Sequence, residues 1–203
     1  MSKQYPCAEC RVKACSRGGE YPAGCPTISE SHVIQQVVIA VAADPFARQT
    51  LAVASELPRH DDGALRTRVA ETLAFCQAMK FSTIGVAFCS MFSREAHVLC
   101  DMLDAHGLHV VPVNCKVGRV SLSDFGVDTP CERRETACNP VTQATLMNAQ
   151  HTDLNIVLGL CVGHDVLFAR HATSPMTTLA VKDRALRHQP LEALRPKPTE
   201  GQA

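Results

Sequence analysis

The chain has 203 residues, a length that suits one domain or one domain with a small appendage. Its 20 Lys and Arg residues balance its 20 Asp and Glu residues, so no basic surface for nucleic acid or an anionic membrane is expected. Aromatic residues make up only 4% and Trp is absent, which leaves few stacking platforms for bases or sugars. Apolar residues at 46% and charged residues at 20% are typical of a globular protein.

Cysteine is the unusual component of this composition. No apolar stretch approaches the roughly 18 residues of a membrane span, and residues 1–6 lack the apolar run of a signal peptide, so we expect a cytoplasmic protein that does not bind membranes. Disulfides are rare in that reducing compartment, and 11 cysteines cannot all pair within one chain. Abundant cysteine therefore indicates metal ligands or reactive thiols.

Residues 1–28 are predicted to form a metal-binding arm. Its cysteines follow the spacing C-x2-C-x4-C-x9-C at Cys7, Cys10, Cys15 and Cys25. The segment has too few large apolar residues to build a core, so a metal is expected to hold it together. The C-x2-C pair is shared by zinc and iron–sulfur sites, and Cys25 followed by Pro26 resembles the end of bacterial ferredoxin motifs. The long last interval departs from the two short pairs usual in structural zinc sites, and both metals stay open for the arm.

Residues 29–194 are predicted to form an α/β domain, which begins with helices. A capping box over residues 27–30 is expected to start the first helix, and Asp44 followed by Pro45 the second. The β-branched run at residues 37–41 leaves a strand as the alternative to the first helix. An amphipathic helix is expected over residues 66–79.

Farther along, short apolar runs of strand length alternate with helical segments. Strands are expected at residues 83–89, 108–115, 154–161 and 177–182, and helices at residues 93–106, 139–149 and 163–171. Continuous apolar strands alternating with helices indicate a parallel sheet covered on both faces. We therefore predict a small Rossmann-like three-layer α/β sandwich with about four parallel strands, followed by a disordered tail at residues 195–203. Neither G-x-G-x-x-G nor a P-loop is present, which argues against a dinucleotide or NTP site.

Three consecutive predicted strands end in cysteine, at Cys89, Cys115 and Cys161. The carboxyl ends of parallel strands lie at one edge of a sheet, about 4.8 Å apart, and ligands of open α/β sheets bind there. Cys138, just before a predicted helix start, is expected to join these thiols from the crossover. A single cysteine at a strand end is usually a small buried hydrophobe, but three in succession favour a functional cluster.

The other cysteines receive different interpretations. Cys76 and Cys100 lie on apolar helix faces and are expected in the core. Cys131 lies in the loop at residues 117–137, where a spare ligand, a redox thiol and no role at all remain open.

Sites made only of thiolates select zinc, Cu(I) or iron–sulfur clusters. Cysteines from distant segments are common in iron–sulfur proteins, whereas a structural zinc is less needed beside a sheet that has its own core. An iron–sulfur cluster is therefore the favoured cofactor for Cys89, Cys115, Cys138 and Cys161. If only three of them ligate, the fourth iron position is open to substrate.

Polar residues flank this predicted site. His164 and Asp165 begin the helix after Cys161, where free N–H groups attract anions; His164 is a candidate for proton transfer, while Asp165 alone is better explained as a first-turn acid. Lys116 follows Cys115, and Lys182 follows the fourth strand. These four are the candidate catalytic residues, with a solvated surface role as the alternative for the two lysines.

Ordered motifs give the chain a family resemblance. They are C-x-x-C at residues 7–10, IGVAFC at 84–89, VNCKVG at 113–118, CNPVTQA at 138–144 and LGLCVGHD at 158–165. The chain resembles an uncharacterised family of small bacterial and archaeal proteins described as cysteine-rich and metal-binding. VKDR at 181–184 and HQP at 188–190 are similar to its C-terminal motif, with Gln189 where Asn is expected.

The resemblance extends from Cys7 to about Pro190. It implies a helix over residues 30–42, and metal binding both by the four arm cysteines and at a shared site. The shared site comprises Cys89, Cys115, Cys138 and Cys161. The resemblance supplies no reaction.

Three functions stay open. The first is an iron–sulfur enzyme or sensor that binds a small anionic or sulfur-containing molecule. The second is an electron carrier that works with a redox partner protein, and the third is a zinc protein whose arm serves an interaction. The polar residues at the sheet edge and a loop long enough to act as a lid favour the first.

Overall fold

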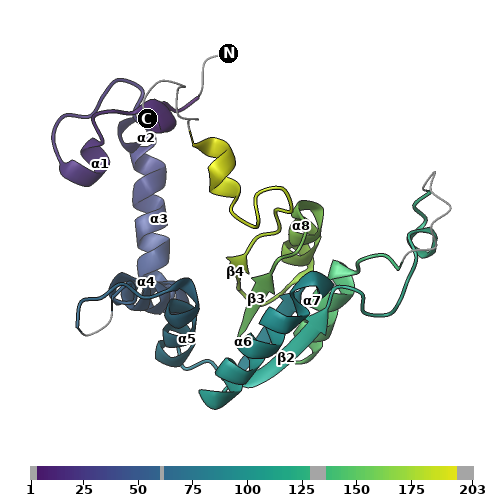
Figure 1. Cartoon of the computed structure of the whole chain (residues 1–203). Helices are drawn as coiled ribbons and strands as arrows, with labels where there is room; N and C mark the ends of the chain where they lie inside the picture. Colours follow the sequence, from purple (N-terminus) through teal and green to yellow (C-terminus); the bar gives the residue numbers. More distant parts are fainter. Residues whose placement is uncertain (1–3, 60–61, 129–135, 196–203) are drawn as a thin grey trace, which may run out of the picture. The chain divides into compact units, whose positions relative to one another are not determined.

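The computed structural model describes residues 4–59, 62–128 and 136–195 (Figure 1). By contacts the chain divides into two compact units, Met1–Glu56 and Leu57–Ala203. Cys131 lies outside the described residues, as does all of the expected tail except Arg195.

The first unit contains the cysteine-rich segment and two longer helices. Its elements are the 3₁₀ helix η1 (Cys7–Glu9) and the helices α1 (Ala14–Arg17), α2 (Pro26–Ser29), α3 (Ser31–Ala43) and α4 (Pro45–Glu56). Residues 37–41 are helical, so the strand alternative is wrong for them. The cap at Asp44 is confirmed, because its Oδ1 accepts the N–H of Phe46 at 2.9 Å and that of Ala47 at 3.3 Å.

The expected capping box at residues 27–30 is wrong. Pro26 takes the first position of α2 and starts that helix before Thr27, because its fixed φ favours the first helical turn. Glu30 then ends α2 and precedes α3, and its side chain makes no capping hydrogen bond.

No single helix in the described part of the chain has the length and apolar character needed to cross a membrane. α3 and α4 reach that length and composition only when taken together, and the pair is bent by 94°.

The second unit is an α/β sandwich, as predicted. Its main elements are α5 (Arg68–Ala78), β1 (Thr83–Phe88), α6 (Ser93–Ala105), β2 (His109–Asn114), α7 (Pro140–Ala149), β3 (Leu154–Leu158), α8 (Val162–His171) and β4 (Met176–Ala180). Three 3₁₀ helices, η2 (Ser90–Phe92), η3 (Ser123–Phe125) and η4 (Pro190–Leu194), complete it. The four strands are all parallel, in the order β2-β1-β3-β4.

Alternating side chains of the strands build two buried layers, one on each face of the sheet. Ile84 and Ile156 pack with Leu73 of α5 and Leu99 of α6. The other face carries Ala87, Val157, Ala144, Met147 and Phe168, which join β1 and β3 to α7 and α8. α7 and α8 also pack against each other (Figure 1). The sheet is therefore the middle layer of three.

The strand order places a topological switch between β1 and β3. The chain passes from β1 to β2 on one side and then returns to β3 on the other, and ligands of such sheets bind outside the carboxyl ends at this point. The two strand ends stay joined there, because the Cys89 N–H donates to the Leu158 carbonyl at 3.1 Å. Gly159 then turns the chain with a φ of +67° beneath the Phe92 ring.

Candidate functional site

The carboxyl edge of the sheet carries three cysteines and one lysine. Cys115 follows β2 directly and Cys89 follows β1 directly, whereas Cys161 comes between β3 and α8 as the N-cap of α8. Lys182 lies shortly after the end of β4. Since the strands are ordered β2-β1-β3-β4, these four residues follow one another along a single edge.

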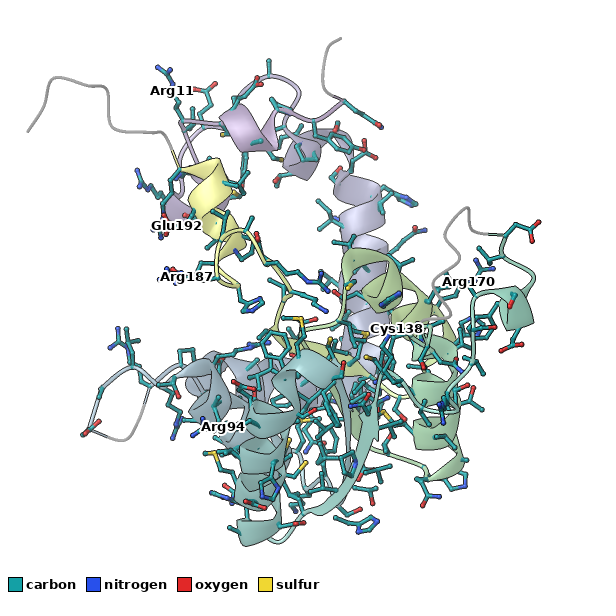
Figure 2. All side chains as sticks on the ribbon, turned by 45° about the vertical axis from the view of Figure 1, so that its right-hand side comes forward. Arg11, Arg94, Cys138, Arg170, Arg187 and Glu192 are labelled. Atoms are coloured by element: carbon teal, nitrogen blue, oxygen red, sulfur yellow. The ribbon has the colours of Figure 1, made fainter. Side chains whose placement is uncertain are left out.

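Cys138 joins this edge from the crossover, next to Cys115. The two Sγ atoms are 3.7 Å apart, close to the separation of about 3.8 Å between two sulfurs on one tetrahedral zinc ion. The Asn139 N–H donates to the Cys115 carbonyl at 2.7 Å, which holds the two backbones together. Cys115 is buried, and Cys138, labelled in Figure 2, is half-buried.

Cys89 lies against Lys182. The Lys182 ammonium donates to Cys89 Sγ at 2.9 Å. Burial opposes ionisation of this thiol, but the bond from Lys182, a bond from the Met91 N–H and the lysine charge together lower its pKa. Cys89 therefore carries more thiolate than an ordinary cysteine does.

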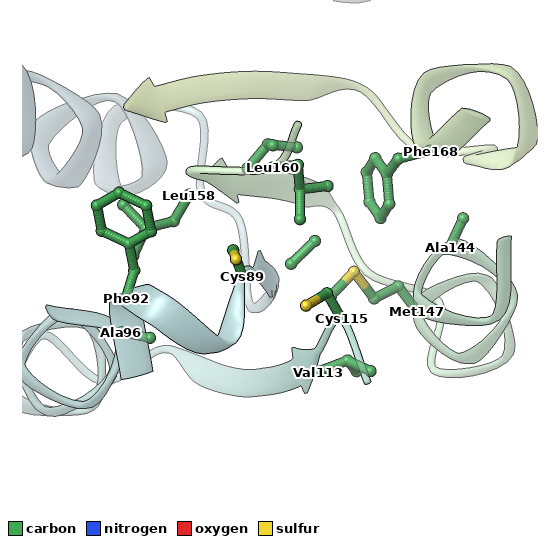
Figure 3. Close-up of a cluster of buried hydrophobic side chains, with 12 residues drawn as sticks. Cys89, Phe92, Ala96, Val113, Cys115, Ala144, Met147, Leu158, Leu160 and Phe168 are labelled. Atoms are coloured by element: carbon green, nitrogen blue, oxygen red, sulfur yellow. The ribbon is translucent and has the colours of Figure 1, made fainter. Parts of the chain in front are cut away.

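Cys115 behaves in the opposite way. Burial raises the pKa of its thiol to about 11, and the neighbouring Cys138 and Cys89 raise it as well. The hydrogen bond from the Ser90 N–H acts in the opposite direction and lowers it. That N–H lies 3.4 Å from the sulfur. Figure 3 shows Cys89 and Cys115 within the buried cluster, with Phe92 and Leu158 on one side and Phe168 on the other. Ionising both thiols needs added positive charge, which a bound metal supplies.

The start of α8 adds His164 and Asp165 to the surroundings of the thiols. Burial lowers the pKa of His164, and the charges of Lys182 and Lys116 lower it further, so the imidazole is held neutral near the two lysines. Burial raises the pKa of Asp165, and its buried Oδ1 has no hydrogen-bond partner within the residues that the structure covers. Lys116 donates to the Thr136 carbonyl, at the end of the loop that leads to Cys138.

Gln143 of α7, which is not among the residues predicted for the site, supports the strand ends. Its fully buried side chain donates to the Val113 carbonyl at 2.7 Å and to the Phe88 carbonyl at 3.3 Å. Each acceptor lies close in sequence to one of the cysteines at the strand ends. The buried face of α7 consists of Pro140, Gln143, Ala144 and Met147. Gln143 is the polar side chain among them, and a polar residue at the helical spacing of an apolar face is the sequence signal that indicates its role.

The arm brings its four cysteines around one cavity. Cys7, Cys10, Cys15 and Cys25 line it together with Tyr21, and its volume is about 120 Å³. The Lys13 N–H lies 3.4 Å from Cys10 Sγ and points a donor at that sulfur. A cavity of this size is several times what one water needs, so it has room for more than a single ion.

As the side chains stand, among the described residues no three His, Cys, Asp or Glu residues lie close enough to hold one metal ion. Cys76 and Cys100 lie apart from the thiols of the sheet edge. Cys76 is a member of the cluster under α5 and α6, and Cys100 packs against that cluster, which confirms the expected core roles.

Replacing Lys182 with Met is expected to raise the pKa of Cys89 in the metal-free protein, because the substitution removes the ammonium that stabilises the thiolate. At neutral pH the variant should contain less thiolate than the wild type, and the difference should vanish once the pH exceeds both pKa values. Ultraviolet absorbance of the thiolate during a pH titration measures this. Lys116→Met is the control and should leave the Cys89 step in place; an unchanged titration of Lys182→Met would contradict the pairing.

Comparisons with known proteins find one family model and one relative, and neither has an assigned activity. A family model described as "Protein of unknown function (DUF1847)" matches residues 25–179, a range that includes all four cysteines of the sheet-edge group. The uncharacterized protein MJ0455 of Methanocaldococcus jannaschii is 40% identical over 130 residues, which cover 64% of this chain and 67% of that protein. No solved structure matches the chain significantly.

Proposed function

The chain belongs to the DUF1847 family of proteins of unknown function, and from this premise we propose that it is an iron–sulfur protein that binds a small anionic molecule at its sheet edge. One observation carries the proposal. Cysteines follow three adjacent parallel strands at one edge, and a fourth thiol lies 3.7 Å from one of them. We call Cys89, Cys115, Cys138 and Cys161 the sheet-edge thiols.

The donor set fits a cluster better than a single ion. All four groups are soft sulfurs, which select zinc, Cu(I) or iron–sulfur centres. Each thiol of a four-iron cluster binds its own iron, so the sulfurs need not converge on one point. This wider spacing agrees with the sheet edge, because among the described residues no three ligand side chains lie close enough together to hold one ion.

The groups around the sheet-edge thiols suit an anionic ligand. Lys116 and Lys182 both act electrostatically on His164, so two cationic side chains lie near one neutral imidazole. The lysines would attract an anion, and His164 would exchange a proton with it through a ring nitrogen. A cluster bound by three of the thiols would supply electron transfer or an open iron as a Lewis acid.

The arm is proposed to hold a second centre. Four cysteines line its cavity of about 120 Å³, and the segment has few large apolar side chains with which to form a core. Tyr21 lines the same cavity, and both tyrosines of the chain, Tyr5 and Tyr21, lie in the first unit. Tyrosine fluorescence of the chain therefore comes from the arm.

Zinc is the second candidate for the sheet edge. The 3.7 Å between the sulfurs of Cys115 and Cys138 is the observation that favours it, because it matches two corners of a zinc tetrahedron. Zinc and a cluster differ in iron content, acid-labile sulfide and visible absorption.

The test is anaerobic reconstitution of the full chain, with iron, sulfide and zinc counted per chain. We expect two centres in the wild type. The double variant Cys89→Ser/Cys115→Ser should lose the sheet-edge centre and keep the arm centre, including its effect on tyrosine fluorescence. Cys7→Ser/Cys10→Ser should lose the arm centre and leave the sandwich folded by circular dichroism.

Cys100→Ser, on α6 outside both sites, is the matched control and should load like the wild type. Full iron and sulfide in Cys89→Ser/Cys115→Ser would contradict the sheet-edge cluster. Zinc without sulfide at that edge would select the second candidate, and unfolding of the sandwich in Cys7→Ser/Cys10→Ser would make the arm integral to the whole chain.

A further inference from the structure

The contact between Cys115 and Cys138 joins two thiols directly. Their sulfurs are 3.7 Å apart, and a disulfide requires about 2.0 Å, so a closing movement of roughly 1.7 Å is enough.

Hydrogen bonds hold the two thiols in place from both sides. The Asn139 N–H donates to the Cys115 carbonyl and the Ala137 N–H donates to the Val120 carbonyl, each at 2.7 Å. Residues on both sides of Cys138 are thus fixed against the turn that follows β2. The Ser90 N–H, 3.4 Å from Cys115 Sγ, holds the second sulfur.

Cys89 is less suited to pair with Cys115. Its sulfur accepts a hydrogen bond from the Lys182 ammonium at 2.9 Å, and pairing with Cys115 would take the sulfur away from that donor. Exposure also separates the thiols, since Cys138 is half-buried whereas Cys115 is only 1% exposed and Cys89 only 4% exposed. Of these three thiols, Cys138 is therefore the one that a reagent from solvent reaches most easily.

From these contacts we infer that Cys115 and Cys138 form a reversible disulfide in the metal-free protein, and that this bond controls loading of the sheet edge. The loading part rests on the proposed function. The oxidant is a small disulfide of the glutathione type. The Cys138 thiolate attacks it, forming a mixed disulfide and releasing one thiolate; the Cys115 thiolate then attacks the Cys138 sulfur and releases the second.

The protein loses two protons and two electrons in this exchange, and the small disulfide becomes two thiols. The new bond removes two of the four sheet-edge thiols from the ligand set. A dithiol reductant reverses the exchange and restores them. The sheet edge is thus available to a metal only when the surrounding thiol pool is reducing.

The experiment treats the metal-free full chain with oxidised glutathione and maps its disulfides by peptide mass spectrometry. The wild type should yield the Cys115 peptide joined to the Cys138 peptide, with a mass two hydrogens below the sum of the two separate peptides. Cys115→Ser should stop at a glutathione adduct on Cys138, and Cys138→Ser should form neither product. Cys100→Ser should behave like the wild type. A dominant bond to Cys89 or to an arm cysteine would overturn the inference.

Reconstitution of the oxidised protein then tests the control of loading. Iron uptake at the sheet edge should be lost on oxidation and should return after treatment with a dithiol. The variant Cys7→Ser/Cys10→Ser, which lacks the arm centre, should lose and regain its iron uptake in the same way. Equal loading of both forms overturns the control and leaves the proposed cluster standing. A disulfide between Cys115 and Cys138 in a protein whose reduced sheet edge takes up no iron overturns the cluster and leaves the redox pair.

Discussion

Gly159→Ala is expected to destabilise the second unit by about 2–5 kcal/mol. Gly159 has a φ of +67°, where an L residue costs about 1–2 kcal/mol, and a Cβ there would lie closer than 3.0 Å to three ring atoms of Phe92. Relieving such a contact in a packed core typically costs about 1–3 kcal/mol more. Urea unfolding followed by circular dichroism measures the loss.

Gly163→Ala is the matched control for this substitution. Gly163 lies in the first turn of α8, has no φ in the left-handed region and has open space around its Cβ position. The control should unfold within about 0.5 kcal/mol of the wild type or be slightly more stable. If Gly159→Ala unfolded like this control, the close approach of Phe92 to the chain after β3 would be refuted.

Phe168→Ala should cost about 3–5 kcal/mol, the usual loss for a buried Phe. Phe168 is fully buried and joins α8 to the cluster that contains Cys89 and Cys115 (Figure 3). Because Cys161 caps α8, loosening this helix should also weaken metal retention at the sheet edge. Val166→Ala, on the exposed side of the same helix with 63% exposure, should change the free energy of unfolding little. Equal effects of the two substitutions on urea unfolding would contradict the assigned packing of α8.

Much of the sandwich is predictable because its strands are short, apolar and separated by good helix signals. The helix predicted over residues 139–149 starts at Pro140, and Asn139 Oδ1 accepts the Thr142 N–H at 3.0 Å as its N-cap. The capping box at residues 27–30 failed because two start signals overlap, and Pro26 begins a short helix before the box can act. Local patterns locate helix starts well only where one signal is present.

The sheet edge was predictable only in outline. Alternation of strands and helices places Cys89, Cys115 and Cys161 at one edge, because parallel strands share their direction. It does not identify partners, since the contact of Lys182 with Cys89 spans 93 residues and depends on the order of the strands. The two amide donors to the strand ends belong to Gln143, whose role depends on the packing of α7.

The two sets of cysteines close chain segments of very different length, which fixes an order of assembly. The arm cysteines are local, whereas the bond between Lys182 and Cys89 requires almost all of the second unit to have been made. Synthesis proceeds from the N-terminus, and local contacts form before long-range ones. The arm can thus close during translation, while the sheet edge is complete only after β4 has left the ribosome. A nascent chain stalled before β4 should already have its arm cysteines in place and lack the Lys182 contact of Cys89.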